Sequence, residues 1–280
     1  MSIFKPDIRS LQEFTPQKSP VLSGNWRTLW AYRHLLLNLV RKDIRVRYMG
    51  AALGFAWSLA NPLVITIMYL LVFTYLFPSN LPDYPLFIVT GMIHWMFFSQ
   101  VITQSSDVLV ANSGLVKKIY FPRLLIPTST LCTNLTLWSG TLAIYLVLYT
   151  LILGGHFNWV QLLYPVYFAL FLIVIWGLSL CLCTFYVRFR DLKHLVEVAI
   201  QVLFWGTPIV YSISHVPPIA KLILAISPVT EFILICQDLF YWRVAPTWHL
   251  TLALAAWAVV LGGVGTYFFE RRVPHLIEEL

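Results

Sequence analysis

Residues 162–187 read LLYPVYFALFLIVIWGLSLCLCTFYV, a run without a single Asp, Glu, Lys or Arg. A helix of about 20 apolar residues is long enough to cross the hydrocarbon core of a bilayer. This run therefore predicts a transmembrane helix. Several other apolar runs have a similar length, so the same interpretation extends outward from this segment to most of the chain.

The composition of the whole chain agrees with a membrane protein. Hydrophobic residues make up 59% of the 280 positions, charged residues make up only 11%, and mean hydropathy is +0.76. A soluble domain carries about 25% charged residues. Backbone polar groups in lipid must be satisfied internally, which leaves helices or closed barrels, and barrel strands would give shorter alternating segments. We therefore expect an all-α membrane protein.

The apolar runs predict six transmembrane helices. Their expected boundaries are about residues 55–77, 86–109, 124–153, 162–187, 195–212 and 250–269. Breaks that contain Pro, Gly or Asn separate most of these spans. Residues 1–25 are polar and irregular, and we expect them to form a flexible cytoplasmic tail. Residues 26–280 then form a single transmembrane domain.

The distribution of basic residues sets the orientation of the spans. Lys and Arg are enriched in the cytoplasmic loops of membrane proteins. With the N-terminus inside and six crossings, all but two of the 19 basic residues fall on the cytoplasmic side, and the exceptions are Lys221 and Arg243. The formal net charge of +7 is therefore a topology signal, and no nucleic-acid partner is needed to explain it. We expect both termini to be cytoplasmic.

Residues 26–48 differ from the spans because their apolar side chains recur with the period of a helix and are separated by polar side chains. At about 100° per residue, the apolar side chains fall within a stripe of about 120°. These residues are Trp26, Leu29, Trp30, Leu36, Leu37, Val40, Ile44 and Tyr48. Leu35 and Leu39 lie on the polar face, and Arg33 intrudes on the apolar one. The pattern favours an amphipathic helix in the cytoplasmic membrane interface, and a cytoplasmic helix packed on protein is the alternative.

Residues 217–242 are apolar enough to suggest a seventh span. However, Pro217, Pro218 and Pro228 divide them into pieces that are too short to cross a bilayer, and Glu231 would be costly at depth. We therefore predict a re-entrant hairpin of two short helices between spans five and six. Such backbone is tolerated only when it is buried in protein or lines a water-filled cavity. The hairpin is thus a candidate for the outer wall of a pathway.

The sequence contains no pattern for ATP binding or metal catalysis. A G-x-x-x-x-G-K-[ST] loop, an H-E-x-x-H pair and a closely spaced Asp/Glu cluster are all absent. We therefore expect no catalytic residue, no cofactor and no metal in this chain. A membrane enzyme would need such a constellation on facing spans.

The loop after the second span, residues 112–123, reads NSGLVKKIYFPR. Gly114 and Pro122 bracket a short stretch with two lysines and two aromatic residues. An ordinary cytoplasmic loop with interfacial aromatic residues explains this composition. A short helix that docks on a cytoplasmic partner explains it equally well, because aromatic and basic residues suit compact interfaces.

Three separated stretches carry a resemblance to a known family. The first stretch is RKDIRVRY at 41–48, followed by LGFAWSLANP at 53–62. The second consists of Gly91, Trp95 and Phe97-Phe98, followed by LVKKIYFPR at 115–123. The third is RFRDLKHL at 188–195, followed by TPIVY at 207–211 and Val216-Pro217. Together they resemble the permeases of ABC exporters of polysaccharides and polyol phosphates, from about Trp26 to the C-terminus. His94 stands where the family often has Pro, and Ser227-Pro228 stands where Asn-Pro is usual.

The resemblance implies a homodimer of six-span subunits in the bacterial inner membrane, bound to two copies of a separate ATPase that holds ATP and Mg²⁺. Members of the family move O-antigen, capsule or teichoic-acid polymers, usually lipid-linked. By the same resemblance, residues 26–40 would form the interface helix, residues 113–121 the coupling helix on the ATPase, and residues 217–242 a pair of outer gate helices. The expected partners are therefore the ATPase, a second copy of this chain, a lipid-linked polysaccharide and membrane lipid.

These interpretations nominate three groups of residues. The expected ATPase-coupling residues are Ser113, Gly114, Leu115, Lys117, Lys118, Tyr120, Phe121, Pro122 and Arg123. The expected cytoplasmic interface comprises Arg41, Lys42, Asp43, Arg45, Arg47, Tyr48, Arg188, Arg190 and Asp191. The expected outer gate comprises Pro208, Pro217, Pro218, Pro228 and Glu231.

A path for sugar chains needs width, groups that bond to hydroxyls, and flat faces for stacking. Aromatic residues make up 16% of the chain, and their rings offer apolar faces with polar edges. The candidates along the path are Trp57, Tyr69, Phe73, Trp205 and Tyr211. The alternative for each of them is ordinary packing or a place in an interfacial aromatic belt.

Two other functions remain as alternatives. An ion-coupled transporter or flippase of lipid-linked sugars should show intramembrane acids or paired discontinuous helices in two related halves. Asp107 and Glu197 lie near cytoplasmic span ends, and no inverted repeat is visible. A membrane enzyme acting on lipid-linked sugars lacks a visible catalytic cluster. A neighbouring gene for a P-loop ATPase would favour the exporter over both.

Overall fold

The computed structural model describes residues 30–50, 56–76, 81–118, 121–151, 155–224 and 226–276. Within these residues the fold is entirely helical and contains no strand. The predicted tail, residues 1–25, and the first residues of the predicted 26–48 helix lie outside the described residues. Four helices are long and apolar enough to cross a membrane: α4 (Tyr84–Ser106), α7 (Leu125–Leu151), α8 (Tyr164–Arg188) with the 3-10 turn Trp159–Leu163 before it, and α12 (Trp248–Leu276).

The four long helices coincide with four of the predicted spans, with ends that differ by a few residues. Two further predicted spans are shorter helices. The helix α3 (Ala56–Leu71) continues into a π-helical turn, Val72–Leu76, and α9 (Leu192–Gly206) ends before the expected residue 212. The helix α9 ends there because Thr207 precedes a proline and is extended, with φ −108° and ψ 132°.

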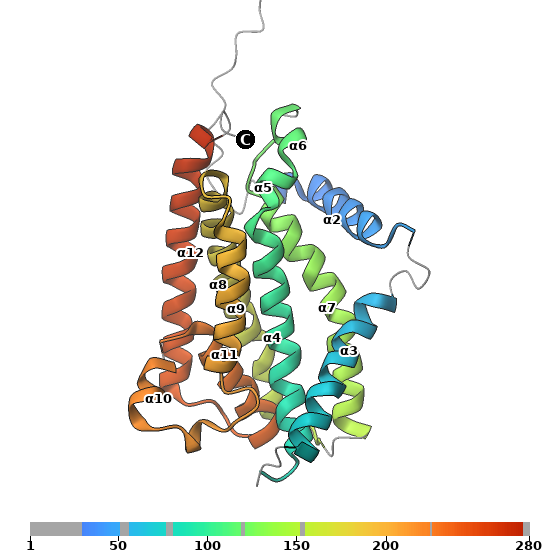
Figure 1. The fold of residues 1–280 in the computed structure, drawn as a ribbon, viewed down its shortest axis with the longest axis vertical. Helices are drawn as coiled ribbons and strands as arrows, with labels where there is room; N and C mark the ends of the chain where they lie inside the picture. The colour runs from blue at the N-terminus through green and yellow to red at the C-terminus, as the bar shows by residue number, and fades with distance from the viewer. Residues whose placement is uncertain are drawn as a thin grey trace, which may run out of the picture.

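The helices form an elongated bundle in which α4 lies between α7 and α8, and α8 packs along α12 (Figure 1). Short helices lie at both ends. The helices α2 (Arg33–Tyr48) and α6 (Ser113–Lys118) lie at the same end as the C-terminal part of α12, and α10 (Pro218–Leu224) lies at the opposite end (Figure 1). This arrangement places the predicted cytoplasmic elements together and the predicted outer hairpin away from them.

The segment 217–242 is divided at its prolines, as the sequence predicts. The helix α10 begins at Pro218, α11 (Pro228–Gln237) begins at Pro228, and a π-helical turn, Asp238–Trp242, follows. The helix α11 packs against α4, α8 and α12. Its apolar residues Phe232 and Ile233 are fully buried, so this short helix is part of the core.

The helix α2 rests on α7, and the face that it buries differs from the predicted apolar stripe. Its buried residues are Leu39 and Val40, although Leu39 belongs to the expected polar face. Leu37, which belongs to the stripe, is 50% exposed. Leu39 belongs to an apolar cluster with residues from the ends of α8 and α12, and Leu35 and Leu36 pack against that cluster. The contact face of α2 is therefore centred away from Leu37. The described part of α2 therefore packs on protein along one face and leaves Leu37 exposed.

The core of the bundle is aromatic and includes one buried imidazole. Phe171 and Phe232 stack with ring centroids 3.9 Å apart. His94 is fully buried beside Phe232, with Nδ1 2.7 Å from the Thr90 carbonyl oxygen and Nε2 2.9 Å from the Tyr164 hydroxyl. Both ring nitrogens are therefore paired, which makes His94 a packing residue of the core.

The helices α8 and α12 approach closely because glycines face each other. A Cβ atom added to Gly177 would collide with the backbone of Leu261 and Gly262, and one added to Gly265 would collide with the backbone of Gly177. Small residues let membrane helices pack at short backbone distances, where dispersion contacts hold them together.

We predict that Gly177→Ala destabilises the protein by about 1–3 kcal/mol, the usual effect of overpacking a tight contact. Gly263→Ala is the matched control, because an added Cβ there has nothing within 4 Å. Thermal unfolding in mild detergent measures the difference. Equal melting temperatures for the two variants would contradict the close α8–α12 contact.

Candidate functional site

The predicted coupling residues lie on or beside a short helix at one end of the bundle. After α4 ends, the chain forms α5 (Val108–Ala111) and then α6 before α7 begins. A docking helix was one of the two interpretations of this loop, and a helix is present. The exposed residues of α6 include Gly114 and Lys117. Tyr120 and the side chain of Lys118 lie outside what the structure describes.

The base of the coupling segment is held by apolar contacts. Val116, Phe121 and Leu124 are buried in one cluster with residues from the ends of α8 and α12. Pro122 is also buried, and Arg123 is half-buried. The segment is therefore anchored at its base and exposed at Gly114 and Lys117.

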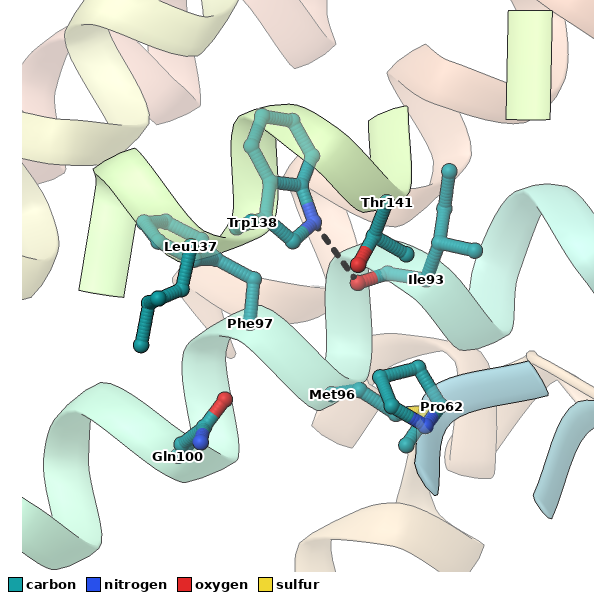
Figure 2. A pocket seen from close by; sticks show the side chains of 8 residues that line it. All are labelled: Pro62, Ile93, Met96, Phe97, Gln100, Leu137, Trp138 and Thr141. Atoms are coloured by element: carbon teal, nitrogen blue, oxygen red, sulfur yellow. Dashed lines mark hydrogen bonds between the residues drawn. The ribbon is translucent and has the colours of Figure 1, made fainter. Parts of the chain in front are cut away.

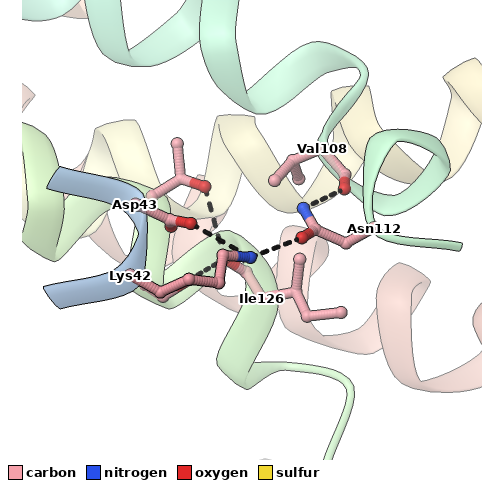
Figure 3. Close-up of polar contacts among 7 residues, drawn as sticks. Lys42, Asp43, Val108, Asn112 and Ile126 are labelled. Carbon is pink, nitrogen blue, oxygen red and sulfur yellow. Dashed lines mark hydrogen bonds and ion pairs between the residues drawn. The ribbon is translucent and has the colours of Figure 1, made fainter. Parts of the chain in front are cut away.

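Polar contacts tie α2 to this segment (Figure 3). Lys42 Nζ lies 3.1 Å from Asn112 Oδ1 and 3.2 Å from Asp43 Oδ1. Asn112 Nδ2 donates in turn to the Val108 carbonyl oxygen at 2.9 Å. The predicted interface residues Lys42 and Asp43 are therefore linked to the turn between α5 and α6.

A second ion pair ties the start of α9 to the junction of α4 and α5. Lys193 Nζ lies 2.6 Å from Asp107 Oδ2. Lys193 precedes the predicted span 195–212, and its hydrogen bond to Asp107 and the charge of that carboxylate raise its pKa above the usual value. The ammonium group therefore stays charged at neutral pH. Partly exposed pairs of this kind contribute about 0–1 kcal/mol, so its main effect is to orient α9.

The remaining predicted interface residues are either half-buried or exposed. Arg47 is half-buried and contacts Gln104 and Asn134, two residues that the sequence interpretation missed. Tyr48 is half-buried. The exposed members are Arg41, Arg45, Arg188, Arg190 and Asp191. The guanidinium of Arg190 lies over the ring of Tyr186, 5.7 Å from its centroid.

A groove of about 350 Å³ lies between α3, α4 and α9. It is lined by Ile65, Tyr69, Met92, Trp95, Met96, Ser99, Ile200, Gln201, Phe204 and Trp205. None of these residues carries a formal charge. Large apolar pockets with a few polar groups are typical ligand sites.

Two of the five predicted path residues, Tyr69 and Trp205, line this groove. Phe73 stacks on Tyr69, with centroids 6.0 Å apart, and the Tyr211 hydroxyl donates to the Trp205 carbonyl oxygen at 3.0 Å. Trp57 does not line the groove. The sequence interpretation missed Trp95, Ser99 and Gln201, although a polar residue such as Gln201 within an apolar run is a signal that could have found one of them.

A smaller cavity between α3, α4 and α7 is a packing gap (Figure 2). Its volume is about 20 Å³, and Pro62, Met96 and Trp138 are among the residues that line it. Trp138 Nε1 donates to the Ile93 carbonyl oxygen at 3.2 Å, which joins α7 to α4. A cavity needs about 10–15 Å³ of this measure to hold one water molecule. This cavity is thus too small for a sugar.

The predicted outer-gate residues occupy different environments. Pro217 and Pro218 are exposed, whereas Pro208 is buried and its carbonyl oxygen accepts a hydrogen bond from Gln237 Nε2 at 2.7 Å. Glu231 is only 4% exposed, and within the described residues its Oε2 atom has no hydrogen-bond partner. Within the described part of the chain, no three His, Cys, Asp or Glu side chains lie close enough together to hold a metal ion.

The long apolar helices and the short helix presented between two of them define a multi-pass helical protein of the membrane. Residues 34–241 match the ABC-2 type transporter family. The chain belongs to this family, which confirms the resemblance found in the sequence. Proteins of this class are membrane transport subunits.

Three relatives show how far the likeness extends. The chain is 32% identical over 256 residues to the O-antigen export system permease protein RfbA of Myxococcus xanthus. The aligned residues cover 91% of this chain and 98% of the relative. It is 31% identical to the protein of the same name from Klebsiella pneumoniae over 74% of this chain and 80% of the relative. It is 24% identical to the polysialic acid transport protein KpsM of Escherichia coli over 64% of this chain and 70% of the relative.

Proposed function

We propose that this chain is the membrane subunit of an ATP-driven exporter that moves a lipid-linked polysaccharide, of O-antigen or capsule type, across the bacterial inner membrane. The observation that carries the proposal is the match to an O-antigen export permease over nearly the whole length of both chains. Membership of the ABC-2 type transporter family favours this function over an ion-coupled transporter or a membrane enzyme.

The proposed topology has six crossings with both termini in the cytoplasm. The helix α3 and its π-helical turn run from Ala56 to Leu76, about 30 Å at a rise of about 1.5 Å per residue, which matches the hydrocarbon core. The helix α9 is shorter, at about 22 Å. The four residues that continue it, 207–210, are not helical but are buried in protein, where irregular backbone is tolerated.

In this topology α10 and α11 form a re-entrant hairpin that enters from the outer side. The helix α11 is too short to cross, yet it is buried against three long helices. Residues 26–280 thus form one transmembrane domain, with α2 in the cytoplasmic interface. The helix α10 lies at the end of the bundle opposite α6 (Figure 1), which supports the proposed gate role for Pro217 and Pro218. Pro228 and Glu231 belong to the gate as residues of α11, and Pro208 as the residue whose carbonyl oxygen accepts from Gln237 of α11.

The energy comes from a separate ATPase, which carries the ATP and Mg²⁺ sites. The sequence has no phosphate-binding loop, and α6 presents Gly114 and Lys117 at the end where the basic residues gather. We assign the coupling role to Ser113–Arg123, including Tyr120 and Lys118. Membership of the ABC-2 type transporter family supports an exporter made of two copies of this chain and two ATPase subunits.

The groove between α3, α4 and α9 forms part of the sugar path. Its rings offer faces for stacking, and Ser99 and Gln201 offer groups that bond to hydroxyls. The lining contains no formally charged side chain that could pair with an ionised sugar. Tyr69 and Trp205 line the path directly, and Phe73 and Tyr211 support them. Trp57 does not line the groove of one copy, so its assignment to the path depends on a second copy of this chain.

The proposed topology can be tested by cysteine labelling. In a variant without the four native cysteines, Lys221→Cys on α10 should react with an impermeant maleimide from the outer face of intact cells. Lys117→Cys on α6 should react only after the membrane is opened. Labelling of both positions from the same side would contradict the topology.

We predict that Lys117→Glu, alone or with Lys118→Glu, lowers polymer export and polymer-stimulated ATP hydrolysis by about fivefold or more, a typical loss of coupling between sites. The physical reason is charge repulsion at the docking surface. The control is Arg272→Glu, an exposed charge at the same end of the bundle on α12. Normal export by the Lys117 variant at normal protein levels would exclude the docking role.

We predict that Trp205→Ala or Tyr69→Ala reduces export by about two- to tenfold, because one aromatic contact is worth about 0.5–1.5 kcal/mol. The matched control is Trp248→Ala, an exposed tryptophan at the start of α12 that does not line the groove. Export is measured with a fluorescent lectin against the surface polymer. Wild-type export by both groove variants would remove these residues from the path.

A further inference from the structure

Arg47 joins α2 to two helices of the bundle through one set of hydrogen bonds. Its Nη1 atom donates to Asn134 Oδ1 on α7 at 3.3 Å, and its Nη2 atom donates to Gln104 Oε1 on α4. Asn134 Nδ2 donates to the same Gln104 oxygen at 2.9 Å. The three side chains therefore form a closed triangle between α2, α4 and α7.

The surroundings make this triangle a specific contact. Asn134 is 1% exposed and is fixed by a second hydrogen bond to the Thr130 carbonyl oxygen at 2.9 Å. In the part of the chain that the structure describes, no carboxylate lies within ion-pair distance of Arg47. The guanidinium is thus held by the dipoles of two amides, and its planar fork can satisfy both at once. Hydrogen bonds to a charged group are stronger than neutral ones, so the two bonds orient the end of α2.

A second polar contact lies about 7.5 Å earlier along the same helix, at a rise of about 1.5 Å per residue. This is the contact between Lys42 and Asn112 at the base of the coupling helix. Leu39, about one turn before Lys42 on the same helix, is buried. The helix α2 is therefore attached to the coupling segment at Lys42 and to the α4–α7 pair at Arg47.

We propose that Arg47 is a positioning residue through which α2 passes the movement of the coupling segment to α4 and α7. The inference rests on the proposed function. When the ATPase displaces α6, Asn112 moves Lys42, and α2 moves as a rigid helix. Arg47 then shifts Gln104, which lies on the same helix as the groove residues Trp95 and Ser99. ATPase closure and the width of the groove are coupled in this way.

The test uses the full chain with its ATPase partner in proteoliposomes, and it measures polymer exported per ATP hydrolysed. Arg47→Met keeps the length of the side chain and removes its donors. We expect this ratio to fall about fivefold or more, in the range of typical coupling energies, while ATP hydrolysis stays within twofold of wild type. Arg47→Lys should restore part of the ratio, because an ammonium group can still donate to one amide at a time.

Arg33→Met is the matched control, because Arg33 is an exposed arginine on the same helix whose polar contacts, among the residues that the structure describes, are with the local Trp30. Its ratio should equal that of wild type. If Arg47→Met does not fold, Gln104→Met replaces it, since this change removes the acceptor that Arg47 and Asn134 share. The ratio should fall in the same way.

An unchanged ratio in Arg47→Met or Gln104→Met overturns the inference. A loss of export and ATP hydrolysis in equal proportion also overturns it, because that result indicates a structural role alone. If the wild-type protein shows no ATP-dependent export with any ATPase partner, the proposed function fails, and the inference falls with it. These outcomes are distinguishable because the first two require an active wild-type complex.

Discussion

The absence of water from the bilayer core is the constraint on which this structure depends, because every backbone polar group there needs a partner within the protein. The long helices meet this requirement by themselves. The broken segment after α9 meets it through side chains of other helices. The Pro208 carbonyl oxygen accepts from Gln237 of α11, and the Val210 carbonyl oxygen accepts from the Tyr84 hydroxyl of α4 at 2.5 Å. The short helix α11 thus supplies a donor to the irregular backbone beside it.

The same requirement explains why polar side chains bond to different kinds of acceptor at the two ends of the bundle. Near the end that holds α10, several of them satisfy backbone carbonyls outside the long helices, as Gln161 does for Leu239 at 3.0 Å and Tyr241 does for Pro82 at 2.5 Å. At the end that holds α6, Lys42 and Lys193 instead bond to side chains of other helices. The first arrangement rigidifies a bent segment. The second links separate segments of the chain through their side chains.

Local features of the sequence predicted most of the fold, and the features that they missed are non-local. The length of an apolar run and the position of a proline act within a few residues, so the four long helices and the division of 217–242 at Pro228 follow from the sequence. The face that a helix buries depends on its neighbour, so Leu39 was placed on the wrong side of α2. Tyr69 and Trp205, two of the aromatic residues expected along a path, line the groove. Trp95 and Gln201 join them only once α3, α4 and α9 are packed together.

The separation of charge along the molecule limits what the groove can hold. The basic residues gather at the end with α2 and α6, and the groove lining contains rings, aliphatic side chains, a hydroxyl and an amide. An ionised group that enters such a lining loses hydration without gaining a counter-charge, which is far more unfavourable than the transfer of a hydroxyl. A hydroxyl can instead bond to Ser99 or Gln201 while its ring stacks on an aromatic face. The lining of the groove is therefore better matched to uncharged, hydroxyl-rich rings than to ionised groups.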